Sequence, residues 1–373
     1  MSKHLRWSDS PWLLLIGAWT YVTFVQGGDD FSYDFGNYLG YFERMADLGA
    51  EDIWAQLQAF FPYPYILVPP AGFFEIGFVA VVWLLLQAGL STAAAYATVG
   101  ALSVTGRLLL MRAMGLGWPT MLLITIYSVT LFEANAIRLG CSLTLTAMAM
   151  LAARRSKPLA ALAWILLAGS FHLQSLAFTL PLAIAWAIFP LVDRSRALRA
   201  LALLLSVLPA AAIALAPGVF DFAKLNEYAD TAAGSVGLNA ASVSGLLALI
   251  IATLAFLTRP AQSETDRGPD ARVWSAVHLA TLPALMLVLM ATSMGPLGDR
   301  VWQFAFVAAV VALPMGRKAM VGTRARRWFS LYALALHGCL WVSVINVTIR
   351  YPLSNFFAPF IPYTPITPLT LII

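Results

Sequence analysis

Long apolar segments recur along nearly the whole chain, about every 20 to 35 residues, and they constrain the fold more than any other feature. Of 373 residues, 60% are apolar or aromatic and 11% are charged, against about 25% charged residues in ordinary soluble domains. A helix needs about 20 mostly apolar residues to cross a hydrocarbon layer of about 30 Å, because every backbone amide in lipid must be satisfied inside its own helix. The sequence therefore predicts an all-α polytopic integral membrane protein and excludes a conventional soluble enzyme.

We predict about eleven membrane crossings, with boundaries good to a few residues. The predicted segments are residues 11–26, 92–111, 119–135, 137–153, 158–171, 173–192, 200–217, 241–258, 273–293, 300–316 and 328–348. Cys141 and Cys339 both fall inside these segments, so neither a disulfide nor a zinc site is expected. Neither internal repeats nor low-complexity tracts interrupt the pattern, which predicts one integral membrane domain over residues 1–373.

Lys and Arg residues gather in short clusters between the apolar segments instead of forming one basic surface. The clusters are Arg107 with Arg112, Arg154 and Arg155 with Lys157, Arg194 and Arg196 with Arg199, Arg259–Arg272, and Arg317–Arg327. Each cluster follows the previous one after an even number of crossings, so all five can lie in the cytoplasm, as the positive-inside rule requires. This assignment places the N-terminus in the cytoplasm. It also explains the net charge of +5 without a nucleic-acid partner.

The first third of the chain needs a segment that enters the membrane without crossing it. With a cytoplasmic N-terminus, the region of about residues 27–75 lies outside, and two further crossings before Arg112 would put that cluster on the wrong side. We therefore expect one or two re-entrant or interfacial helices, Phe73–Gln87 and, as a second, Ile53–Val68. Re-entrant backbone is tolerated where it lines a cavity. The prolines that break the chain here are Pro62, Pro64, Pro69 and Pro70.

Arg138 is the first unusual polar residue on the predicted outer side. It lies between two apolar segments, just after Glu133 and Asn135. One interpretation is an arginine that snorkels to the headgroups, with Glu133 as its ion-pair partner. However, an outer arginine opposes the positive-inside bias unless it holds an anion. Because a planar guanidinium binds phosphate in a bidentate manner, a lipid-linked diphosphate is a suitable ligand, with Glu133 and Asn135 as further candidate substrate contacts.

His172 and Arg300 are predicted to lie on the same side as Arg138. His172 interrupts a long apolar stretch where two crossings meet. It is either a packing or hydrogen-bonding residue, or a general acid or base, since the ordinary pKa of histidine is near neutrality. Arg300 follows Asp299 at the start of another crossing, where an ion pair beside an aromatic belt is the alternative explanation. Two outer arginines together favour an anionic ligand.

A segment after the first crossing carries a carboxylate and two tyrosines. Asp34, Tyr38 and Tyr41 are spaced by four and three residues, which places them on one helical face. Such a segment is either an amphipathic interfacial helix or a face for sugar recognition, because carboxylates accept hydroxyl hydrogen bonds and flat rings cover apolar sugar faces. Glu75 opens the expected re-entrant segment. Asp34, Glu75 and His172 are therefore candidate bases for an acceptor hydroxyl.

The sequence contains no recognisable metal-ligand cluster, nucleotide-binding glycine loop or Ser/His/Asp order. The longest predicted inner loop, Thr258–Val273, is too short for a domain that binds nucleotide sugars. Neither a metal nor a nucleotide nor another cofactor is therefore expected.

Together these residues resemble the EpsG family of bacterial exopolysaccharide polymerases, relatives of the Wzy polymerases. The resemblance rests on the order and spacing of Asp34, Tyr38, Tyr41, Glu75, Asn135, Arg138, Phe171, His172 and Arg300. The chain departs from the family at Leu139, where Gln is frequent, and in the proline-rich tail after Arg350.

The resemblance implies a polymerase at the periplasmic face of the bacterial inner membrane. It would transfer an oligosaccharide from undecaprenyl diphosphate onto another lipid-linked repeat unit, among membrane lipid and with a chain-length-determining co-polymerase as a partner. Arg138 and Arg300 would stabilise the diphosphate leaving group, and Tyr38 and Tyr41 would hold sugar. Two alternatives stay open: an O-antigen-ligase-like or other lipid-linked glycosyltransferase, and a transporter or flippase for the lipid-linked sugar.

Overall fold

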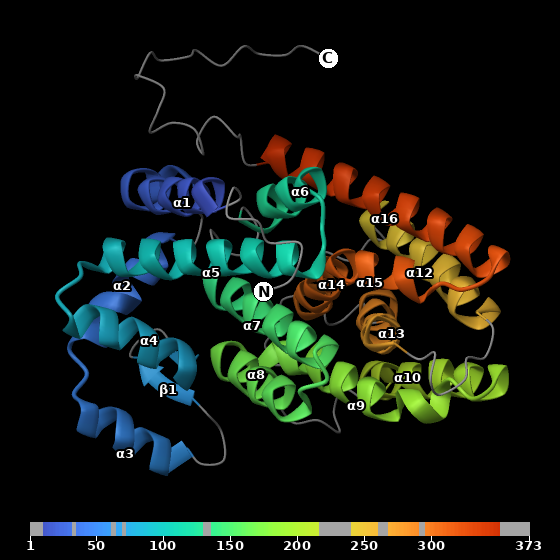
Figure 1. Cartoon of the computed structure of the whole chain (residues 1–373). Coiled ribbons are helices and arrows are strands. Elements are labelled where there is room, and N and C mark those ends of the chain that lie inside the picture. The colour runs from blue at the N-terminus through green and yellow to red at the C-terminus, as the bar shows by residue number, and fades with distance from the viewer. Residues whose placement is uncertain are drawn as a thin grey trace.

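The apolar segments form α-helices in the computed structural model, which describes residues 10–31, 35–60, 65–68, 72–129, 136–215, 240–259, 268–290 and 295–350. The helices are α1 (Ser10–Phe31), α2 (Phe35–Ala46), α3 (Ala50–Phe60), α4 (Ile76–Gln87), α5 (Thr92–Met114), α6 (Trp118–Ser128), α7 (Ile137–Arg154), α8 (Pro158–Phe171), the short 3₁₀ helix η3 (Leu173–Ser175), α9 (Leu176–Val192), α10 (Arg196–Leu215), α12 (Ala240–Thr258), α13 (Pro269–Met290), α14 (Gly295–Val311), α15 (Leu313–Ala319) and α16 (Thr323–Arg350). They pack into one bundle (Figure 1). The described residues are helical apart from one short hairpin, which confirms the helical fold class.

Four of the described helices are long and apolar enough to cross a membrane: Thr92–Met114, Ile137–Arg154, Leu173–Val192 and Thr323–Ile345. Shorter apolar helices cover Pro11–Phe24, Ile76–Gln87, Pro158–Phe171, Leu247–Thr258 and Val301–Val311. Each segment predicted to cross overlaps at least one described helix, but the count of about eleven crossings and the cytoplasmic N-terminus stay predictions. Cys141 and Cys339 are buried free thiols.

A β-hairpin replaces part of a predicted helix in the first third of the chain. Strand β1 (Tyr65–Val68) pairs antiparallel with β2 (Gly72–Glu75), with Tyr65 opposite Glu75 and Val68 opposite Gly72. The expectation of one helix over Ile53–Val68 is therefore wrong beyond Phe60, where α3 ends. Prolines precede and follow β1 in the sequence, and proline cannot continue a helix because it lacks the amide hydrogen and its ring clashes with the preceding turn.

Helix α4 starts where β2 ends and has twelve residues. At 1.5 Å per residue this is about 18 Å, less than the hydrocarbon thickness of about 30 Å, as expected for a segment that does not cross. The side chain of Trp83 ties α4 to the α2–α3 turn by donating a hydrogen bond from Nε1 to the carbonyl of Leu48, at 2.8 Å. Figure 1 shows α2, α3, α4 and β1 together at the left side of the bundle.

Helices α5 and α7 run side by side in the same direction. The hydroxyl of Thr144 donates to the carbonyl of Ser103 at 3.0 Å, and Arg154 Nη1 donates to the carbonyl of Ala113 at 3.2 Å. The carboxyl ends of both helices, each carrying one of the predicted cytoplasmic clusters, therefore lie together.

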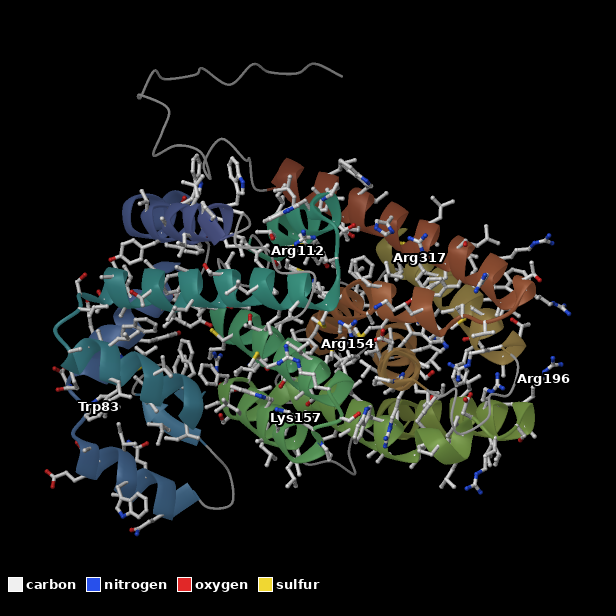
Figure 2. All side chains as sticks on the ribbon, viewed as in Figure 1. Trp83, Arg112, Arg154, Lys157, Arg196 and Arg317 are labelled. Atoms are coloured by element: carbon white, nitrogen blue, oxygen red, sulfur yellow. The ribbon has the colours of Figure 1, made fainter. Side chains whose placement is uncertain are left out.

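Ion pairs join the other predicted cytoplasmic clusters at this end of the bundle. Asp270, in the first turn of α13, lies 2.5 Å from Arg154 Nε and 3.4 Å from the Nζ of Lys318, a residue in the last turn of α15. A second, fully buried cluster joins Asp193 to Arg199 and Arg259, where α9 ends, α10 begins and α12 ends. In Figure 2 the labelled cations all lie away from the side that holds Trp83. These contacts support the prediction that the basic clusters share one side.

Close packing of α4 on α8 depends on Gly77. A Cβ atom added at Gly77 would lie 2.8 Å from the backbone oxygen of Ser170, which is too close for a real contact. We expect Gly77→Ala to force the two helices apart and to lower the free energy of unfolding by about 1–3 kcal/mol. Thermal unfolding of the detergent-solubilised protein measures the effect.

Gly338 is the matched control, because a Cβ atom there meets nothing within 4 Å on α16. Gly338→Ala should leave the melting temperature unchanged or raise it, since alanine favours a helix over glycine by about 0.5–1 kcal/mol. Equal melting temperatures for Gly77→Ala and wild type would contradict the packing argument.

Candidate active site

Glu75 and Arg138 form a buried ion pair between two distant parts of the chain. Glu75 ends β2 and is the N-cap residue of α4, whereas Arg138 lies in the first turn of α7. Arg138 Nη1 donates a hydrogen bond to Glu75 Oε2. Glu75 is 4% exposed, and the guanidinium lies over the ring of Phe74 with 4.6 Å to its centroid. The hairpin therefore supplies both a carboxylate and an aromatic face to the same arginine.

His172 meets the other oxygen of the same carboxylate. It lies at the break between α8 and η3, where extended backbone dihedrals of −158° and 104° end the helix. His172 Nδ1 is 3.3 Å from Glu75 Oε1, and its Nε2 is 3.1 Å from Gln174 Oε1. The amide of Leu173 donates to Glu75 Oε1 at 3.1 Å. One carboxylate thus bridges the arginine and the histidine that the sequence placed on one side.

The charge state of Glu75 follows from these contacts. Burial alone would raise the pKa of Glu75, but the charge of Arg138 and the hydrogen bond and charge of His172 together hold that pKa well below its ordinary value of 4.5. Glu75 is therefore ionised at neutral pH and is a weak proton acceptor. A carboxylate beside an imidazole orients the ring and stabilises its protonated form. This geometry favours His172 over Glu75 as the base.

Aromatic residues of α2 surround this cluster. Tyr38 and Tyr41 lie on one helical face, with ring centroids 6.1 Å apart, as their spacing predicts. Tyr38 is 6% exposed and interacts with the Arg138 guanidinium, so it supports the arginine from inside the protein. Tyr41 is half-buried and packs against Phe74, at 5.0 Å between centroids. Of the two tyrosines, Tyr41 is therefore the better placed to meet a sugar.

The side chains of the remaining predicted site residues are not among those that the structure describes. Asp34, Glu133 and Asn135 lie outside the described residues. Arg300 is part of α14, and its neighbour Val301 lines a small cavity together with Leu139 and Gln174. The backbone at the start of α14 thus lies beside the cluster, and the role of Arg300 stays a prediction.

Sequence reasoning missed two residues of this cluster, Phe74 and Gln174. Each is adjacent or nearly adjacent to a residue that was singled out: Phe74 precedes Glu75, and Gln174 follows His172 by two positions. Aromatic and amide residues beside candidate ionisable groups are the signal that identifies them, because a buried guanidinium and a buried imidazole both need partners.

A bundle of apolar helices with a buried Arg–Glu–His cluster at one end defines a membrane-embedded protein with a candidate active site. The profile of the EpsG family matches residues 13–364, nearly the whole chain, so the chain belongs to the EpsG family, as its residues predicted. EpsG is a Wzy-like polymerase family. Comparisons with curated proteins and with solved structures gave no match.

Removal of the bridging charge tests this cluster. Glu75→Gln leaves Arg138, whose side chain is 17% exposed, without its ion-pair partner, and we expect a loss of about 3–5 kcal/mol of stability. Because folding lowers the pKa of Glu75, its contribution is complete above the ordinary pKa of 4.5 and is lost as the pH falls through the lower folded pKa. The difference in melting temperature between wild type and variant should therefore shrink at acidic pH.

Glu51→Gln is the control, since Glu51 is an exposed carboxylate in the first turn of α3. Its melting temperature should equal that of wild type at both neutral and acidic pH. A Glu75→Gln protein as stable as wild type at neutral pH would show that the cluster does not hold α4 and α7 together.

Proposed function

We propose that this protein is a polysaccharide repeat-unit polymerase that transfers an oligosaccharide from undecaprenyl diphosphate onto a second lipid-linked repeat unit. The observation that carries the proposal is the Glu75 carboxylate bridging Arg138 and His172. This bridge holds a cation that can bind a diphosphate next to a histidine that can act as a base. Membership of the EpsG family supports a polymerase of polysaccharide biosynthesis.

The reaction joins two sugars and releases the carrier. The acceptor hydroxyl oxygen attacks the anomeric carbon of the donor, the bond between that carbon and the diphosphate oxygen breaks, and the diphosphate leaves with the electron pair. No nucleotide is consumed, because the diphosphate already activates the donor. Catalysis then needs a base for the hydroxyl proton and positive charge for the leaving group.

Each residue of the cluster has a role in this scheme. His172 accepts the hydroxyl proton, and Glu75 holds the imidazole in place and stabilises its charge. Arg138, with Arg300, binds the diphosphate as charge develops on it. The diphosphate competes with Glu75 for Arg138, so substrate binding loosens one side of the bridge while the contact with His172 stays. Tyr41 with Phe74 offers an aromatic surface for a sugar ring.

The proposed setting is the bacterial inner membrane, with the cluster facing the periplasm. The basic clusters gather at one end of the bundle through Arg154, Asp270 and Lys318. The positive-inside rule assigns that end to the cytoplasm. Lipid-linked units that have been moved across the membrane then meet the cluster on the other side, where a co-polymerase that sets chain length would also act.

Reconstitution with a purified diphosphate-linked repeat unit tests the proposal. Wild type in liposomes should convert the unit into a ladder of polymers, resolved by gel electrophoresis. We expect Arg138→Ala and His172→Ala each to lower the rate by about 100-fold or more, because each removes charge stabilisation or proton transfer in the transition state. Arg300→Ala should also slow the reaction.

Arg155→Ala is the matched control, an exposed arginine in the turn after α7 at the other end of that helix. It should make the same ladder as wild type. Ladders from Arg138→Ala and His172→Ala that equal the wild-type ladder would exclude this site. If the wild-type protein only transferred finished polymer to another acceptor, or only moved the lipid between leaflets, polymerase activity would be excluded.

A further inference from the structure

A second polar cavity lies among the basic clusters, away from the candidate active site. It occupies about 580 Å³ between the α5–α6 turn, the α14–α15 junction and α16. Arg317 and Lys318 line it together with Thr120 and His337. Both cations are exposed, and Lys318 reaches Asp270 with a 3.4 Å ion pair at 55% side-chain exposure. The candidate active site does not use any of these residues.

The floor of this cavity is apolar. Val310, Leu313 and Phe329 line it beside Ala333 of α16. Burial of such side chains next to two cations makes the cavity amphipathic, with an apolar part and a cationic rim. A free inorganic anion would use only the rim, whereas a lipid with an anionic headgroup would use both parts.

The surroundings of the cavity are those of a lipid-facing surface. Next to the lining residues, α16 exposes large apolar side chains, with Leu334 at 71% and Trp341 at 55% exposure. This helix is also one of the four long and apolar enough to span a membrane. Figure 1 shows α16 along the outer edge of the bundle, where no other helix covers it in this view. An acyl chain can therefore reach the cavity from the membrane.

The polar groups in the cavity are arranged for an anion. His337 Nδ1 donates to the carbonyl of Ala333 on its own helix at 2.7 Å, and Nε2 shares a hydrogen bond with the Thr120 hydroxyl at 3.1 Å. That bond fastens α6 to α16 across the cavity. Gly117, the N-cap residue of α6, also lines it, and no side chain caps this helix start. The positive end of the α6 dipole thus adds to the charge of Arg317 and Lys318.

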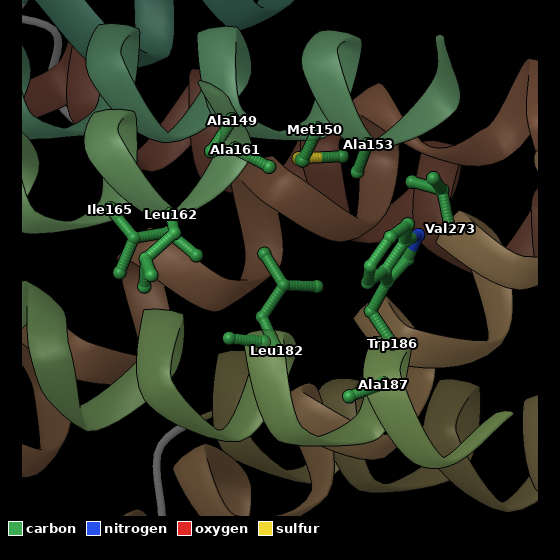
Figure 3. A pocket seen from close by; sticks show the side chains of 11 residues that line it. Ala149, Met150, Ala153, Ala161, Leu162, Ile165, Leu182, Trp186, Ala187 and Val273 are labelled. Carbon is green, nitrogen blue, oxygen red and sulfur yellow. The ribbon is translucent and has the colours of Figure 1, made fainter. Parts of the chain in front are cut away.

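Comparison with another cavity shows what this one adds. A cavity of about 190 Å³ lies between α7, α8 and α9, and all of its lining residues are apolar or aromatic, among them Met150, Leu182 and Trp186 (Figure 3). It offers room for an aliphatic group but no cation for a headgroup. In Figure 2 the label of Arg317 lies beside the ribbons of α15 and α16.

We propose that the cavity between α6, α15 and α16 binds an anionic phospholipid, with its phosphate at Arg317 and Lys318 and one acyl chain on the floor of Leu313 and Phe329. Basic pockets between helices on the cytoplasmic side of membrane proteins have this chemistry. Occupation would brace α6 against α16 at the end of the bundle opposite to the candidate active site.

The test uses the full chain purified in detergent, titrated with dioleoylphosphatidylglycerol and, separately, with dioleoylphosphatidylcholine, with bound lipid counted by native mass spectrometry. We expect phosphatidylglycerol to bind and phosphatidylcholine to bind much more weakly. The double substitution Arg317→Gln with Lys318→Gln should weaken phosphatidylglycerol binding by about 30-fold, since each cation near an anionic headgroup contributes about five- to sixfold in affinity.

Lys157→Gln with Arg196→Gln is the matched control, because it removes two exposed cations that belong to the predicted cytoplasmic clusters but do not line the cavity. Its affinity should stay within about twofold of wild type, since screened charges beyond a Debye length contribute little. Equal losses in both double variants would overturn the proposal, because the effect would then be one of net charge alone.

Ala333→Phe separates a lipid from a soluble phosphate compound. The larger side chain fills part of the apolar floor and leaves both cations in place, so phosphatidylglycerol binding should fall while the melting temperature without lipid stays at the wild-type value. Inorganic phosphate should not displace the lipid at millimolar concentration. Displacement by phosphate together with unchanged lipid binding in Ala333→Phe would overturn the lipid proposal in favour of a soluble phosphate ligand.

Discussion

The ionised carboxylate of Glu75 is the point on which both the fold and the candidate site depend. Removal of a charge from water is expensive, and a buried carboxylate is tolerated only when partners replace the lost hydration. Here the partners come from separate elements: Arg138 at the start of α7, and His172 with the Leu173 amide at the α8–α9 break. Loss of any one partner leaves the others with uncompensated charge, so the geometry of the site is enforced by the stability of the fold.

The elements around Glu75 place its carboxylate between Arg138 and His172. Helix α4 has twelve residues and starts directly from the hairpin, whose last residue is Glu75. The absence of a side chain at Gly77 lets α4 approach the backbone of Ser170, directly before the His172 break. The next residue of α4, Phe78, packs against Tyr38, which also interacts with Arg138. The interior of this region is therefore built around one ion pair.

Much of this arrangement could be predicted from the sequence, and the part that could not has a physical reason. Apolar length predicted the helices, and charge sidedness predicted that Arg138 and His172 share one end. The partner of Arg138 was open, because Glu133 is near in sequence whereas Glu75 is 63 positions away, and no local pattern encodes a contact at that distance. The hairpin was missed because a short apolar run such as Tyr65–Val68 fits a strand as well as a helix. The informative signal was the pair of flanking prolines, not the periodicity.

The two ends of the bundle differ in how far carboxylates neutralise their cations, and this difference bears on which side of the membrane the candidate site faces. At the basic end, Asp270 forms ion pairs with both Arg154 and Lys318. Asp193 likewise forms ion pairs with both Arg199 and Arg259. Each carboxylate is thus shared by two cations, so positive charge is left in excess. Excess positive charge favours the anionic cytoplasmic leaflet. At the other end, Arg138 would oppose that orientation if it stood alone, but Glu75 neutralises it in the absence of substrate. Because the Glu75–Arg138 pair carries no net charge, this arginine does not weigh against an outer location of the candidate site.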